Sequence, residues 1–310
     1  MRGIFVRPAD GRVRAGWRYL FFLAALALAG ALQHGVRRAL DLAPLRGADG
    51  VVLPESILTR GLLGMGFTLA VTAVLLRFVE KRPLSTVGLP SRGPWVRGMA
   101  IGLLLGAAPV ALLVAVLAAT GDAGVQAGGL SARDLLWPWL PTVLGLLLVS
   151  SMEELMLRGY GLQLLAEAGG RWFAALFTGA LFGAMHAGNP GANALGIVNT
   201  AASAVLLAWL VMRTGSLWIA CGYHSGWNLA GAMVFGMRVS GLDHPAGLLA
   251  TRLTGPEWLT GGSYGFEGSV LVGLLELVVL ALAVAIAPRL PGHPDLRGHF
   301  GARPPRIGAG

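Results

Sequence analysis

Long apolar runs separated by short polar breaks dominate this sequence. Runs of roughly 17–25 residues are long enough for a helix to cross a hydrocarbon core about 30 Å thick, at about 1.5 Å of rise per residue. The pattern therefore predicts an all-α, polytopic membrane helix bundle with about eight transmembrane helices and no soluble domain. The predicted spans are residues 17–36, 57–79, 98–120, 137–165, 172–188, 194–213, 216–237 and 268–287.

The spans divide the chain into four predicted parts. These are N-terminal transmembrane helices (1–134), a core (135–235), an outer loop with the last helix (236–290) and a tail rich in Pro, Gly and Arg (291–310). We expect the tail to be disordered. Most of the 24 Lys and Arg residues fall on the side of the spans that holds the N-terminus. Since basic loops stay inside, both termini are predicted to be cytoplasmic.

Composition supports a membrane location. The mean hydropathy is +0.68 and only 13% of the residues are charged, which is too few to solubilise a chain of this length. The net charge of +9 suits contact with membrane lipid, whose head groups are often anionic. No basic region is interleaved with stacking aromatic residues, so nucleic acid is not a predicted partner. The single cysteine, Cys221, excludes an internal disulfide.

Three short polar motifs interrupt the predicted spans. An ionisable side chain at the centre of a membrane helix costs about 2.5–3.5 kcal/mol, so such residues are usually functional. Several of them in three neighbouring spans indicate one shared site. The motifs contribute Glu153, Glu154 and Arg158 to the span 137–165, Phe182 and His186 to the span 172–188, and His224 and Asn228 to the span 216–237.

The lengths of two helices predict that Glu153 and His186 lie at the same depth. A hairpin about Gly169 and Gly170 would make the two spans antiparallel. With straight helices, Glu153 would lie roughly 21 Å from the turn and His186 roughly 22 Å. We therefore expect the two side chains to meet, and we expect His224 and Asn228 to converge on the same intramembrane cavity, because buried polar groups need partners where lipid supplies none.

The two adjacent acids are predicted to differ in role. Glu154 and Arg158 are four residues apart, so they share a helix face and can neutralise each other. Glu153 is turned about 100° away from that face. Glu154 is thus expected to be held by the arginine, which leaves Glu153 available for chemistry.

Two mechanisms fit these residue types. A carboxylate beside a histidine can take a proton from water, while a second histidine and an amide stabilise the oxyanion. Alternatively, His186, His224 and Glu153 could hold Zn²⁺, since two histidines and one carboxylate are a familiar zinc ligand set. The sequence leaves both open and requires no cofactor.

The order and spacing of the motifs resemble those of the CPBP family of intramembrane proteases, which includes type II CAAX prenyl proteases and bacterial Abi proteins. The resemblance covers residues 135–235. It implies an eight-helix bundle that cleaves peptides near prenylated C-termini, and it makes Glu153 the base that activates water, supported by Glu154 and Arg158. The second and third motifs of the family correspond to Phe182 with His186 and to His224 with Asn228.

We therefore predict an intramembrane endopeptidase, in a bacterial cell membrane, that hydrolyses a peptide bond with water activated by Glu153. Its predicted partner is a peptide or protein substrate, with a prenylated C-terminus as the type that the resemblance implies. The alternative is a non-catalytic immunity, scaffold or transport protein on the same fold, in which the polar network only stabilises the bundle.

Several polar residues receive structural interpretations. Phe182 is expected to pack rather than to react. Cys221, three residues before His224, could form a thiol–histidine nucleophile, but no third group orients such a pair, so we interpret it as a small buried residue. Glu276 could pair with Arg158, enter the cavity or lie protonated in the bundle, and the last is preferred. The remaining histidines, His34, His244, His293 and His299, are expected to be solvated.

Overall fold

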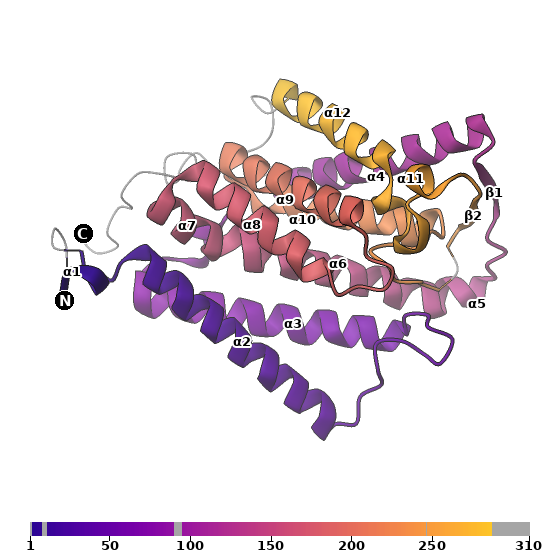
Figure 1. Cartoon of the computed structure of the whole chain (residues 1–310). Helices are drawn as coiled ribbons and strands as arrows, with labels where there is room; N and C mark the ends of the chain where they lie inside the picture. Colours follow the sequence, from indigo (N-terminus) through magenta and orange to yellow (C-terminus); the bar gives the residue numbers. More distant parts are fainter. Residues whose placement is uncertain (1, 8–10, 90–94, 246, 287–310) are drawn as a thin grey trace.

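The computed structural model describes residues 2–7, 11–89, 95–245 and 247–286, and the predicted tail 291–310 lies outside them. The described chain is an all-α bundle with one small sheet (Figure 1). Its main helices are α2 (Ala15–Ala39), α3 (Pro54–Val74), α4 (Trp95–Thr120), α6 (Leu140–Glu154), α7 (Gly161–Gly169), α8 (Arg171–His186), α9 (Ala194–Thr214), α10 (Leu217–Asn228) and α12 (Val270–Ile286). Short elements are α1 (Arg2–Phe5), α5 (Ala132–Asp134), α11 (Glu257–Thr260), the strands β1 (Ala123–Ala127) and β2 (Leu249–Leu253), the π-helical turns η1 (Leu75–Glu80), η3 (Leu135–Trp139), η4 (Leu155–Tyr160) and η5 (Leu229–Val234), and the 3₁₀ turns η2 (Leu84–Val87), η6 (Gly262–Tyr264) and η7 (Phe266–Gly268).

Each of the eight predicted spans coincides with a helix or with consecutive helical segments. Within the described residues, five helical stretches are long and apolar enough to cross a membrane, and the helix at 270–285 is a shorter apolar one. The all-α membrane bundle is therefore confirmed. The five stretches are Ala15–Ala39, Pro54–Glu80, Trp95–Thr120, Ala132–Gly169 and Ala194–Thr214.

Glycines bring α4 and α10 into backbone contact. A Cβ atom added at Gly106 would lie 2.0 Å from the Tyr223 carbonyl oxygen, and one at Gly226 would lie 2.2 Å from that of Leu103. Any side chain at these positions would push the helices apart, since small residues are what allow such close approach in lipid. The glycine spacing thus fixes the helix that carries His224 and Asn228.

The two ends of the bundle are built differently (Figure 1). At one end, β1 and β2 pair antiparallel, with Ala123 opposite Leu253, beside α11. At the other end, where α1 lies, the buried Arg18 of α2 donates to Glu80 and Glu167. These ion pairs join α2 and α7 to the end of the α3–η1 helix.

The expectation of one straight helix from Glu153 to the hairpin turn was wrong. Gly159 has φ −76° and ψ −114°, a conformation that is not helical, and it interrupts the helical path between α6 and α7. Glycine lacks the Cβ atom that restricts other residues, so it permits this break inside an apolar stretch. The hairpin turn itself is present: α7 ends at Gly169, and α8 begins at Arg171.

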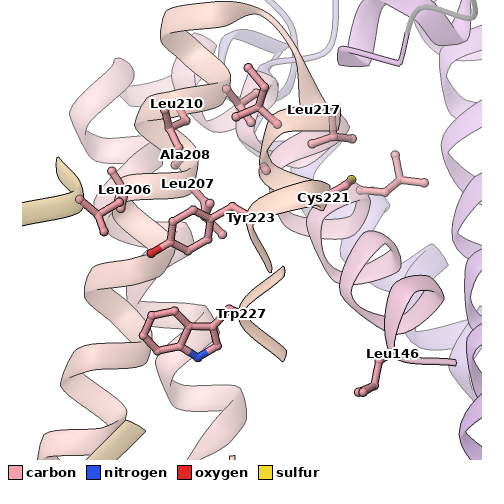
Figure 2. Close-up of a cluster of buried hydrophobic side chains, with 14 of the residues drawn as sticks. Leu146, Leu206, Leu207, Ala208, Leu210, Leu217, Cys221, Tyr223 and Trp227 are labelled. Carbon is pink, nitrogen blue, oxygen red and sulfur yellow. The ribbon is translucent and has the colours of Figure 1, made fainter. Parts of the chain in front are cut away.

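Side chains of α10 divide between two neighbouring helices (Figure 2). Tyr223 and Trp227 lie on the side that faces α9, next to Leu206 and Leu207, all within the main buried cluster. Cys221 points to the other side of α10, and its Sγ atom lies 4.0 Å from the carbonyl oxygen of Ser151 in α6. The core therefore holds α10 between α9 and α6.

Candidate active site

The six candidate residues come from four helical elements. Glu153 and Glu154 end α6, and Arg158 follows in η4. His186 is the last residue of α8. His224 and Asn228 lie one helical turn apart in α10, and Asn228 is its last residue.

Four of these residues line a single cavity, as predicted. Glu153, His186, His224 and Asn228 contribute to its wall together with apolar and polar residues from α2, α3, α6, α8 and the loop after η5. The other lining residues are Gln33, Leu45, Val52, Ile57, Arg60, Leu146, Val149, Met152, Met185, Asn189, Val239, Ser240, Leu242 and His244. We call this space the main cavity. A water molecule and a peptide bond could meet all four polar groups there.

Glu154 and Arg158 form a fully buried ion pair. Both side chains have no exposed area, and Arg158 Nη1 donates to Glu154 Oε1 over 3.0 Å. The predicted pairing is thus confirmed. The same Oε1 atom also lies 2.9 Å from His224 Nδ1. Since a carboxylate accepts hydrogen bonds, His224 donates through Nδ1. This fixes the orientation of the ring and turns Nε2 toward Glu153.

The contact between Glu154 and His224 was not expected. The two residues are 70 positions apart, and local spacing indicates only the partner four residues away. The sequence therefore assigned Glu154 one partner where the structure gives it two.

Phe182 packs against three of the candidate side chains. The Arg158 guanidinium lies 4.8 Å from the centre of its ring, within the range of a cation–π contact. The ring centres of His186 and His224 are 4.5 Å and 5.7 Å from that of Phe182. Phe182 thus fixes the relative positions of the other groups by packing, as the sequence suggested.

His186 has one ring nitrogen engaged and one available. Nδ1 lies 2.8 Å from the carbonyl oxygen of Phe182. A carbonyl oxygen can only accept, so Nδ1 carries the hydrogen and Nε2 has a free lone pair. His186 can therefore accept a hydrogen bond from a molecule in the main cavity.

Glu153 is the acid that faces the main cavity. Its side chain is 19% exposed, whereas that of Glu154 is fully buried. Glu153 Oε2 lies 3.8 Å from His224 Nε2, which is too long for a direct hydrogen bond. On the same side of the cavity, Asn228 Nδ2 donates to Ser150 Oγ over 3.0 Å. Ser150, which the sequence did not indicate, thus orients the amide.

Glu276 does not pair with Arg158. It accepts a hydrogen bond from Ser203 and lines a second cavity, which we call the rear cavity. This rear cavity shares His186, His224 and Asn228 with the main cavity. Of the three alternatives for Glu276, entry into a cavity is thus present, and the preferred one, a protonated acid in the bundle, stays a prediction.

Zinc binding by His186, His224 and Glu153, the alternative that the sequence left open, stays a hypothesis. No group of three or more His, Cys, Asp or Glu side chains among the described residues is arranged to hold a metal ion. His224 uses Nδ1 to contact Glu154, and His186 uses Nδ1 to contact a backbone carbonyl. The donors His186, His224 and Glu153 line the same cavity, and we derive no step through a metal.

His244 lies in the loop after η5, where we expected a solvated histidine, yet it lines the main cavity. Burial lowers the pKa of this imidazole from 6.5 to about 4, because the charged form loses hydration. The folded protein therefore keeps His244 neutral at a pH at which the unfolded chain would protonate it.

This shift predicts that acid destabilises the protein. Between about pH 6.5 and pH 4 the unfolded chain binds more protons at this position, so stability falls as the pH decreases. Replacing His244 by Gln should reduce the loss of Tm over this interval by several degrees relative to wild type. The measurement is Tm against pH for both proteins, and parallel curves would contradict the assignment.

Cys221 is only 2% exposed, and its thiol faces Ser151 rather than a histidine. It lines neither of the two cavities described above. Replacing Cys221 by Ala should leave kcat/KM within about threefold of wild type, because a group remote from the reacting atoms contributes no transition-state stabilisation. Peptide cleavage by both proteins, with and without a thiol-alkylating reagent, tests this. Loss of activity in a folded C221A protein would favour a thiol nucleophile.

Comparison with known proteins agrees with the geometry. Residues 135–230 match the family model described as type II CAAX prenyl endopeptidase Rce1-like. No curated protein and no solved structure matches the chain. The matched segment contains Glu153, Glu154, Arg158, His186, His224 and Asn228. Three of the five apolar helical stretches precede it, and the other two lie wholly or largely within it. The chain is thus an integral membrane protein, and its residues 135–230 are similar to the Rce1-like type II CAAX prenyl endopeptidases.

Proposed function

We propose that the protein is an intramembrane endopeptidase that hydrolyses a peptide bond with water activated by Glu153. The observation that carries this proposal is the pair of unequal acids at the end of α6. Glu154 is buried and bound to Arg158 and His224, while Glu153 faces a cavity with two histidines and an amide. One acid thus organises the site, and the other is free to take a proton.

The reaction begins with a water molecule between Glu153 and His186. Nε2 of His186 accepts one hydrogen bond from the water, and the Glu153 carboxylate takes a proton as the oxygen attacks the carbonyl carbon. The carbonyl oxygen becomes an oxyanion. The same proton then passes from Glu153 to the amide nitrogen as the C–N bond breaks, so Glu153 acts first as base and then as acid.

His224 and Asn228 stabilise the oxyanion in this proposal. In its protonated form the His224 ring carries a hydrogen on both nitrogens: Nδ1–H donates to Glu154, which fixes the ring, and Nε2–H donates to the oxyanion from a constant direction. The ion pair of Glu154 with Arg158 keeps that carboxylate in place. Asn228 Nδ2 has a second hydrogen besides the one given to Ser150. Donors held in place before the reaction lower the barrier most, because they need no reorganisation.

The lining of the main cavity suits an apolar substrate. Most of its remaining wall consists of apolar side chains, among them Leu45, Ile57, Val149 and Leu242. A lipid-modified cysteine near a C-terminus, as in the substrates that the family name describes, would place its hydrocarbon chain against such a surface. We therefore include peptides with a prenylated C-terminal region in the proposed substrate class.

The experiment is a cleavage assay of the purified full chain in detergent with a peptide library. Prenylated and unmodified members of the same sequences are compared, and mass spectrometry identifies the products. We expect a single cut near the C-terminus, with the prenylated form preferred. A folded protein that cleaves no member would contradict the proposal and favour a non-catalytic immunity, scaffold or transport role.

A further inference from the structure

The rear cavity borders the active-site residues, and the mechanism above does not use it. Among the residues that line both cavities are His186, His224 and Asn228. The other walls of the main cavity come mostly from α2, α3 and α6, whereas those of the rear cavity come mostly from α9, α10 and α12. A molecule held in the rear cavity therefore lies next to the reacting groups.

Two buried polar atoms of the rear cavity have no hydrogen-bond partner among the described residues. One is the hydroxyl of Tyr223, the only polar atom in a side chain whose residue is 2% exposed. The other is Oε2 of Glu276, which is 6% exposed and accepts from Ser203 through Oε1. Figure 2 shows the Tyr223 hydroxyl directed away from α10 toward α9. Since burying such groups unpartnered is costly, both need a ligand.

The two unpartnered groups lie near each other without satisfying each other. Glu276 acts electrostatically on the Tyr223 hydroxyl, yet the two make no direct hydrogen bond. Polar groups in this relation are commonly joined by a bridging water. The Tyr223 hydroxyl can donate or accept, and a carboxyl group can hydrogen-bond water in its charged and in its neutral form. One water molecule between them therefore satisfies both.

The size of the rear cavity also suits water. Its volume is about 40 Å³. One buried water needs at least about 10–15 Å³ and a few polar partners, so there is room for roughly two or three. The other acid in the wall, Glu267, already accepts hydrogen bonds from Trp227 and Ser240 through its two carboxylate oxygens. No group of three or more His, Cys, Asp or Glu side chains in the described part of the chain is arranged to hold a metal ion, so water fits better than a cation.

The reaction gives this water a use. Each peptide bond that is hydrolysed consumes one water molecule, and a substrate bound in the main cavity takes the place of water there. His186, whose Nε2 atom positions the attacking water in the proposed mechanism, lines both cavities. Water in the rear cavity thus lies beside the position that must be refilled.

Resting on the proposed peptidase activity, we propose that the rear cavity is a water-binding site, held by Tyr223 and Glu276, that replaces the water consumed at His186. Tyr223 and Glu276 are then positioning residues, which act through the water and do not touch the substrate. Because the site supplies a reactant, its loss should lower kcat while substrate binding is kept.

The first test locates the water without turnover. Crystal structures of the full chain in a lipid matrix, at a resolution that shows ordered water, are compared for wild type and Tyr223→Phe. We expect a water within hydrogen-bond distance of the Tyr223 hydroxyl and of Glu276 Oε2, and we expect the variant to lose it. A thallium(I) soak, read by anomalous scattering, tests for a cation. A dry rear cavity in wild type, or a thallium peak at Glu276, would overturn the proposal.

The second test measures the effect of Tyr223→Phe on cleavage. One hydrogen bond to the water is lost, so kcat should fall about 3–10-fold with KM unchanged. Tm should change little, because phenylalanine keeps the packing of the ring. The matched control is Tyr19→Phe, since Tyr19 of α2 is equally buried but lines neither cavity. We expect this control to cleave like wild type.

Two substitutions of Glu276 separate water binding from charge. Leucine has about the same size but cannot bind water, so Glu276→Leu should lower kcat about 10-fold. Glutamine still forms hydrogen bonds with water, so Glu276→Gln should lose only about two- to threefold. If Glu276→Gln is as impaired as Glu276→Leu, the site needs the carboxyl group itself, and the assignment to water is wrong.

A third variant excludes water without removing a polar group. Val272 and Val279 are both buried in α12, but only Val272 lines the rear cavity. Val272→Ile adds a methylene group there and should lower kcat with KM unchanged, whereas Val279→Ile should not. This pair keeps the proposal testable if Glu276→Leu does not fold. Unchanged kcat in both Val272→Ile and Tyr223→Phe would overturn the supply of water from this cavity.

The outcomes also separate this inference from the proposed function. The crystallographic water is seen whether or not the chain cleaves a peptide. A water at Tyr223 and Glu276 in a folded protein that cleaves nothing would contradict the peptidase, and with it the supply role, but not the water site. Cleavage that needs Glu153 but is indifferent to Tyr223→Phe and Val272→Ile would leave the proposed function standing and overturn this inference.

Discussion

Replacing Glu153 by Gln is expected to reduce peptide hydrolysis at least ~10²-fold while the protein remains folded, because removing a general base typically costs this much. Glutamine has nearly the same shape as glutamate but cannot take a proton from water. Glu153 makes no short ion pair, and its side chain faces the main cavity, so folding should depend little on its charge. The measurement is kcat/KM together with Tm.

The matched control for this variant is Glu257→Gln. Glu257 is an exposed acid in α11 and lines neither cavity, so the same chemical change should leave cleavage unchanged there. Retained activity in Glu153→Gln would show that another group activates the water. Loss of activity together with a large drop in Tm would indicate that Glu153 acts mainly on folding.

Replacing Arg158 by Ala is expected to destabilise the protein as well as to inactivate it. The change leaves the fully buried Glu154 with His224 as its only partner and removes the cation from the face of Phe182. Breaking a buried ion pair by removing one partner costs about 3–5 kcal/mol. Tm and the yield of folded protein should both fall, and Arg133→Ala, at an exposed position, should change neither.

A second substitution tests the cause of this loss. If the unpaired charge of Glu154 is responsible, Glu154→Gln in the Arg158→Ala background should recover part of the Tm, because it removes that charge. It should not recover activity, since Glu154 also orients His224. An Arg158→Ala protein that melts like wild type and loses only turnover would mean that Arg158 acts on the substrate.

The sequence predicted the features that depend on local spacing. The apolar runs predicted the helices, since each run is a helix or a series of consecutive helical segments. The pairing of Glu154 with Arg158 follows from the four-residue period of a helix, and it is present. The close packing of α4 and α10, which places His224 and Asn228, rests on glycines at four-residue spacing, which is also a local pattern.

Features that depend on distant residues could not be read in the same way. The contact of Glu154 with His224 and that of Asn228 with Ser150 join helices that are 70 or more positions apart. A single sequence contains no local pattern that indicates such distant pairs. His244 and Arg60 were not predicted to line the cavity either, because a loop and a peripheral helix reach it only through the packing of the whole bundle.

The wrong prediction of one straight helix from Glu153 to Gly169 has a physical cause. The apolar pattern continues through Gly159, so the sequence predicts one unbroken helix, yet Gly159 adopts a non-helical conformation there. A glycine inside such a stretch permits a break but does not require one. Glu153 and His186 still line the same cavity, although the two straight helical segments of equal length from which we predicted this are not both present.

The central claim is that water attacks the peptide carbonyl carbon without a covalent enzyme intermediate. The most direct test is a single turnover in water enriched in oxygen-18, with enzyme in excess over a peptide that wild type cleaves. Intact-mass measurements follow both the products and the protein. The account predicts one oxygen-18 atom in the new carboxylate of the product, no covalent adduct on the protein at any time, and no product from Glu153→Gln. An acyl adduct on the protein, or product formed by Glu153→Gln at the wild-type rate, would contradict it.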